Sequence, residues 1–163
     1  MNRVLAAGLL AATFALPNAA PAQSHDPAAH HLHGGAMPAP ADERQPVSFP
    51  APLREHTLAN MRDHLLTLTE IQAALAKADF DRAADLAETR LGMSSLEAHG
   101  AHEVAKYMPK AMQDAGTAMH RSASRFALAA KDASTSGDLR PALAALSEVS
   151  SSCVACHAAF KLK

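Results

Sequence analysis

The chain ends in SSCVACHAAFKLK, and this stretch holds the only two cysteines among its 163 residues. Cys153 and Cys156 are three positions apart, and His157 follows directly. Four kinds of site use such a group. They are covalent haem attachment with the histidine as iron ligand, a structural disulfide, a dithiol redox pair and a zinc site.

The surroundings of the motif separate these four alternatives. A disulfide within one helix closes almost no loop and therefore constrains the unfolded chain very little. A thioredoxin-like pair requires a βαβ setting, and the sequence indicates no strands. A zinc site needs a fourth ligand and usually a second Cys/His pair. The sequence thus favours one covalent haem c, with thioether bonds from both cysteines and His157 as the proximal iron ligand.

The elements that position the motif are predicted to be helices, because apolar residues recur at steps of three and four. The four stripes are Leu58, Met61, Leu65 and Leu68; Phe80, Ala83, Ala84, Ala87 and Leu91; Met108, Met112, Ala115, Met119 and Phe126; and Leu146, Val149, Cys153, Cys156 and Phe160. Residue types that start and stop helices predict four of them, near 53–77, 80–97, 109–133 and 139–160. Short connections favour antiparallel neighbours, so we expect an all-α, up-down-up-down four-helix bundle that carries the haem.

Two stretches, CVACHAAFK and ADFDRAADLAE, give this layout a resemblance to the cytochrome c′ and cytochrome c556 family, over about residues 53–163. Members of that family are exported haem proteins and are often homodimers. The resemblance implies that Lys161 is the basic residue that commonly follows the proximal histidine by one turn. It also implies that one residue of the first helix faces the iron. A methionine there gives a six-coordinate electron carrier, and an apolar residue gives a five-coordinate protein that binds nitric oxide or carbon monoxide.

Two residues compete for this distal position. Counting back from the second helix favours Met61, and antiparallel packing sets Met61 level with the end of the fourth helix. Leu58 is the rival, because Arg54 stands one turn before it, where the family usually has an arginine. Arg54 is also a candidate partner for a haem propionate, since guanidinium matches carboxylate geometry. Met112 is a further candidate for the distal side of the haem pocket.

The N-terminal part predicts export. Residues 1–22 have a basic start, a short apolar run and a small-residue cleavage pattern, which is typical of a signal peptide. Residues 23–50 are rich in proline, glycine and histidine and predict a disordered tail, so that residues 51–163 form the bundle. We expect a periplasmic protein without a later membrane span. Cleavage leaves 14 basic against 16 acidic residues, which gives no reason to expect a nucleic-acid partner.

Copper is a second metal that the chain could bind. Cleavage after Ala22 would create the terminus Gln23-Ser24-His25, in which an amine, two amide nitrogens and the His25 imidazole can bind Cu(II). The methionines of the third helix would suit Cu(I). A copper-handling protein is therefore an alternative function. The main expectation is electron transfer with a redox partner protein, and the absence of a catalytic triad, phosphate loop or carboxylate pair argues against an enzyme.

Overall fold

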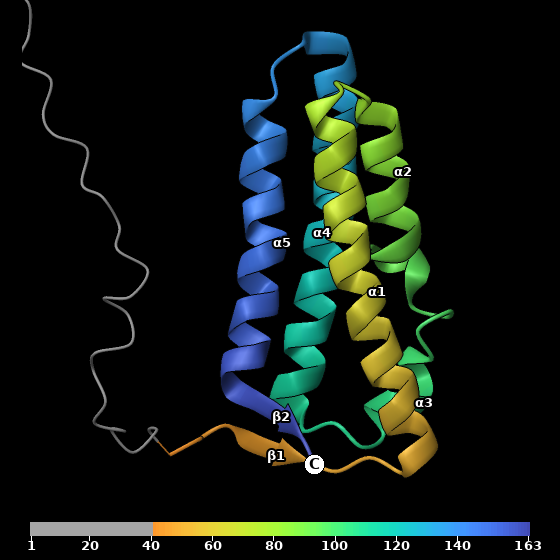
Figure 1. The fold of residues 1–163 in the computed structure, drawn as a ribbon, viewed down its shortest axis with the longest axis vertical. Helices are drawn as coiled ribbons and strands as arrows, with labels where there is room; N and C mark the ends of the chain where they lie inside the picture. Colours follow the sequence, from red (N-terminus) through yellow and green to blue (C-terminus); the bar gives the residue numbers. More distant parts are fainter. Residues whose placement is uncertain (1–40) are drawn as a thin grey trace, which may run out of the picture. The chain divides into compact units, whose positions relative to one another are not determined.

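The computed structural model describes residues 41–163, of which Asp42–Lys163 form one compact unit. The expected signal peptide, the His25 copper site and most of the tail lie outside the described residues. The elements in chain order are β1 (Gln45–Val47), α1 (Ala51–Ala76), α2 (Phe80–Arg90), the short 3-10 helix η2 (Met93–Ser95), α3 (Ala101–Ala105), α4 (Lys110–Ser136), α5 (Arg140–Ala159) and β2 (Phe160–Leu162). The expectation of a mainly helical chain is confirmed, and α1, α2, α4 and α5 run side by side in Figure 1.

The helix ends follow local chemistry. The Asp79 side chain accepts a hydrogen bond from the backbone N–H of Arg82 at 3.2 Å, which caps α2 as its sequence predicts. Gly137 ends α4 in the left-handed region at φ 71°, where glycine carries no steric penalty. The second helix ends at Arg90 rather than at 97, because the N–H groups of Leu91 and Gly92 both turn back to the Ala87 carbonyl.

A short strand pair closes one end of the helices. Gln45–Val47 pairs in parallel with Phe160–Leu162, and Val47 and Phe49 are buried against Met112. Part of the segment 23–50, for which we expected disorder, is therefore ordered, and the folded unit begins before residue 51. Three-residue strands are too short to leave a periodic signal, and this pair forms only when the two ends of the folded unit meet (Figure 1).

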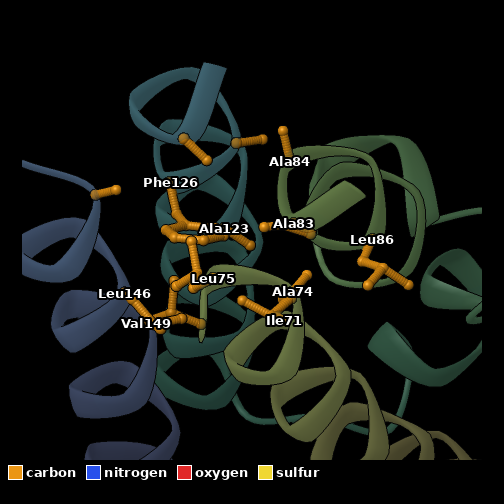
Figure 2. Close-up of a cluster of buried hydrophobic side chains, with 14 of the residues drawn as sticks. Ile71, Ala74, Leu75, Ala83, Ala84, Leu86, Ala123, Phe126, Leu146 and Val149 are labelled. Carbon is orange, nitrogen blue, oxygen red and sulfur yellow. The ribbon is translucent and has the colours of Figure 1, made fainter. Parts of the chain in front are cut away.

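The main core lies where α4 packs closely against both α2 and α5, while α1 packs on α2. Figure 2 shows Phe126 and Ala123 of α4 facing Ala83 of α2, with Leu146 of α5 beside them. Alanines occupy many of these contact positions, which lets the helix backbones approach one another. Among the described residues, α1 and α5 are not closely packed. These two helices leave a space between them at the end that holds the strand pair.

The buried face of α1 differs from the apolar stripe that its sequence predicts. Leu65 is 68% exposed, whereas Thr57, His64 and Thr67 are buried. The two threonine hydroxyls donate to the carbonyls of Leu53 and Asp63 at 2.8 Å, so their burial leaves no unpaired polar atom. The apolar pattern of the sequence cannot identify this buried face, because hydrogen bonds to the backbone allow its threonines to be buried.

The expectation that no later stretch could span a membrane needs a correction. The helix Arg140–Ala159 is long and apolar enough to do so by length and composition, and 17% of its most apolar window is buried. Soluble core helices pass the same test. Within the described part, the less buried side of α5 includes residues that border the space next to α1.

Candidate functional site

A cavity of about 550 Å³ opens at the end of the helices where the strands pair. Its walls come from α1, α3, α4, α5 and β2, together with the segment before α3 and Arg44 at the edge of β1. This volume is in the range of sites for small molecules and cofactors. The cavity lies between α1 and α5, the two helices that are not closely packed against each other.

The cavity brings together every residue that the sequence proposed around a haem. Its lining includes Arg54, Leu58, Met61, Met112, Cys153, Cys156, His157 and Lys161. These residues come from α1, α4, α5 and β2, and up to about a hundred positions of chain separate them. Met112 is buried and the two cysteines are partly buried. His157 lines the cavity but remains exposed, so its ring is not held within the core.

The two cysteines are free thiols on α5. Burial raises the pKa of Cys153, and the neighbouring Cys156 adds to that effect. Burial also raises the pKa of Cys156. Both groups are therefore protonated at neutral pH, whereas reactive redox cysteines have lowered pKa values. This environment disfavours the dithiol redox alternative.

Three basic side chains, Arg44, Arg54 and Lys161, stand at the cavity. Arg44 donates to the His157 carbonyl at 3.5 Å and pairs with Asp42 at 2.8 Å, while Lys161 lies 3.2 Å from the same Asp42 carboxylate. The hydrogen bond from Arg44 is the largest cause of the lowered pKa of Asp42, and Lys161 contributes further. Arg54 pairs with Glu55 at 3.1 Å, so two acids face three cations at this edge. One net positive charge is left for an anionic group that binds there.

The cavity wall also holds a group of histidines from three segments, and sequence reasoning did not place His64 with the other two. His64 of α1, His99 between η2 and α3, and His120 of α4 all line the cavity, and their rings lie close together. In the structure, His64 is buried and His56 is partly buried with its Nε2 atom 3.0 Å from the His99 carbonyl.

Burial keeps these imidazoles neutral. Desolvation, followed by the neighbouring His99 and His120, lowers the pKa of His64 to about 4. Burial is also the main cause of the lowered pKa values of His99 and His120. The spacing of the histidines in the sequence gave little signal for this cluster, because the three rings come from separate segments.

Within residues 41–163, no set of three or more His, Cys, Asp or Glu side chains is already arranged to hold a metal ion. No family model, curated protein or solved structure matches this chain.

Proposed function

We propose that this chain is a c-type cytochrome of the periplasm that transfers electrons to or from a partner protein. The haem would be attached through Cys153 and Cys156, with His157 as its proximal ligand. The finer fold that goes with this proposal is the up-down-up-down four-helix bundle of the cytochrome c′ and c556 type. The observation that carries the proposal is that one cavity collects both thiols, His157 and both distal candidates, Leu58 and Met61.

The chemistry of the lining fits haem in three respects. The thiols and His157 stand in the C-x-x-C-H order that covalent haem attachment uses, and all three lie on α5. Methionine, leucine and alanine side chains make much of the remaining wall, which suits an apolar macrocycle. The basic residues Arg44, Arg54 and Lys161 could pair with two propionates, for which guanidinium groups offer paired donors.

A glycine in α4 gives a fourth argument. Gly116 lies inside the helix and lines the cavity, and a Cβ built on it would meet nothing within 4 Å. A glycine inside a helix costs about 0.5–1 kcal/mol relative to alanine. Within the part of the chain that the structure describes, no atom fills the space beside Gly116. A flat group that occupies the cavity and approaches the backbone would account for it.

Bound haem would supply a reversible one-electron iron couple, whose potential depends on the axial ligands. The chain's own part would be to exclude water and to offer or withhold a sixth ligand. Met61 would favour electron transfer. If Leu58 occupied the distal position instead, the protein would be a five-coordinate binder of small gases, which remains the second candidate because both residues line the cavity.

Expression of the full chain in a host that matures c-type cytochromes tests the proposal. Haem should stay with the wild-type protein through acid–acetone extraction and stain on a denaturing gel. The double variant Cys153→Ser/Cys156→Ser should lose this staining. Val154→Ala is the matched control, because Val154 lies between the cysteines but is 68% exposed. Haem that extracts from the wild-type protein, or a wild-type protein without haem, would overturn the assignment.

A further inference from the structure

Three imidazoles from separate segments meet in the wall of the cavity. The ring centroids of His64 and His99 are 4.8 Å apart, those of His99 and His120 are 5.4 Å apart, and those of His64 and His120 are 6.2 Å apart. The thiols and His157 belong to α5, whereas these rings belong to α1, α4 and the segment before α3. The histidine cluster therefore uses none of the residues assigned to haem attachment.

The ring spacing is close to that of imidazoles that share one ion. A zinc–nitrogen bond is about 2.0–2.1 Å, and the ring centre lies roughly 1 Å farther along the same line. Three rings around one tetrahedral ion would therefore have centroids about 5 Å apart. Packing alone does not favour three neutral imidazoles at this distance, because the polar nitrogens of each buried ring need hydrogen-bond partners.

Hydrogen bonds hold two of the rings in the form that binds metals. The Nδ1 atom of His120 lies 2.7 Å from the Leu91 carbonyl, which can only accept, so Nδ1 carries the proton. The Ser95 hydroxyl donates to the Gly92 carbonyl at 2.7 Å and is therefore free to accept from Nδ1 of His99, 3.3 Å away. In His120 the proton therefore sits on Nδ1 and the lone pair on Nε2, and the Ser95 contact allows the same tautomer in His99. Metal-binding histidines are oriented by outer contacts of this kind.

The third ring, that of His64, has a buried nitrogen without a hydrogen-bond partner. His64 is 7% exposed, and its Nε2 is the one buried side-chain nitrogen or oxygen among residues 41–163 that has no hydrogen-bond partner. An unsatisfied buried polar group typically costs about 1–3 kcal/mol. Burial beside His99 and His120 also holds the pKa of His64 well below its usual range, so the ring is a neutral base at physiological pH. A cation next to Nε2 would satisfy it.

We propose that His64, His99 and His120 form a second site, for a divalent first-row transition ion of the Zn²⁺ or Cu²⁺ class, which neutral imidazole suits. The planes of the rings are inclined by 57°, 39° and 89° in the three pairs. The nitrogens do not yet converge in this arrangement, in agreement with the absence of a ready-made metal cluster among residues 41–163. Binding requires mainly the His64 ring to turn, because its Nε2 has no hydrogen-bond partner, whereas His99 and His120 are held through Nδ1.

Zinc titration of the full-length, matured protein tests the proposal after bound metals have been removed with a chelator. Competition with a chromophoric zinc chelator gives the number of sites and their affinities. The variants His99→Gln and His120→Gln should each lose one zinc equivalent or bind it at least about 100-fold more weakly, since even outer-shell changes cost 10–100-fold. Ser95→Ala should weaken the same site by about tenfold, because it removes the acceptor that orients His99.

The control is His102→Gln, because His102 is an exposed histidine of α3 outside the cluster. It should bind zinc as the wild-type protein does, and N-terminal histidines contribute an equal background to every variant. A copper titration of the same set distinguishes the two ions by their relative affinities. Equal zinc stoichiometry and affinity in wild type, His99→Gln and His120→Gln would overturn the proposal and leave a water molecule as the partner of His64. Haem staining of the same samples reports separately on the proposed cytochrome.

Discussion

The buried His64 ring should make the stability of the metal-free protein depend on pH. The pKa of His64 is lowered from 6.5 to about 4, mainly by burial and then by the neighbouring imidazoles of His99 and His120. Asp63 opposes this shift without reversing it. Above pH 6.5 the ring is neutral in both the folded and the unfolded states. Below that pH His64 binds a proton in the unfolded chain but stays neutral in the folded protein. The free energy of unfolding therefore falls as the pH decreases towards 4.

The magnitude follows from the size of the shift. One pKa unit corresponds to about 1.4 kcal/mol, so a shift from 6.5 to about 4 removes about 3 kcal/mol of unfolding free energy between neutral pH and pH 4. His99 and His120 act in the same direction, because their pKa values are also lowered. A loss of this size is a large share of the 5–15 kcal/mol that stabilises a typical domain.

Urea unfolding followed by circular dichroism, at a series of pH values in the presence of a chelator, measures this dependence. His64→Leu removes the titrating ring and should flatten the curve between pH 6.5 and 4 by about 3 kcal/mol relative to wild type. His102→Leu is the control for the same chemical change at an exposed position, and should follow wild type. If His64→Leu lost stability on acidification as steeply as wild type, the neutral buried ring would not be the cause.

Four further predictions concern the cavity, the core and the end of α4. If Met61 is the sixth ligand of the proposed haem, Met61→Ala should convert a low-spin absorption spectrum to a high-spin one and allow carbon monoxide to bind the reduced protein. Phe126→Ala should cost about 3–5 kcal/mol in urea unfolding, since Phe126 is completely buried in the main core. Gly116→Leu should lower the haem content of the purified protein, because its side chain would enter the cavity. Gly137→Ala should instead lower the free energy of unfolding by about 1 kcal/mol and leave the haem content unchanged. Its positive φ is unfavourable for alanine, whereas a Cβ there would meet no other atom within 4 Å.

The sequence predicted the main helices because their apolar residues recur with a helical period. Ala83, Ala84, Ala87 and Leu91 of the second stripe are all buried, and the ends near Asp79 and Gly137 follow known capping rules. Local chemistry decides such features, so a single sequence contains them. The residues proposed around a haem also line one cavity, because the antiparallel layout brings the start of the first helix near the end of the last.

The features that the sequence did not predict depend on contacts between distant segments. The strand pair exists only because Gln45 and Phe160 meet, and three residues cannot display a period. The polar buried face of α1 is an exception, because the hydroxyls of Thr57 and Thr67 donate within the helix, to the carbonyls of Leu53 and Asp63. The histidine cluster requires α1, α4 and the segment before α3 to be in place before its members become neighbours.

The departures from ordinary core construction gather at one place in the fold. Gly116 weakens a helix where no side chain fills the space, Nε2 of His64 is buried without a partner, and α1 and α5 separate rather than pack. The main core around Phe126 has alanine-rich close contacts instead. Natural sequences usually break such rules at functional sites, where a ligand or a reaction compensates the cost. The proposed haem would account for the glycine and the helix separation, whereas the orphaned nitrogen calls for a cation or a water molecule in the cavity wall. Two different occupants would therefore account for these features better than either one alone.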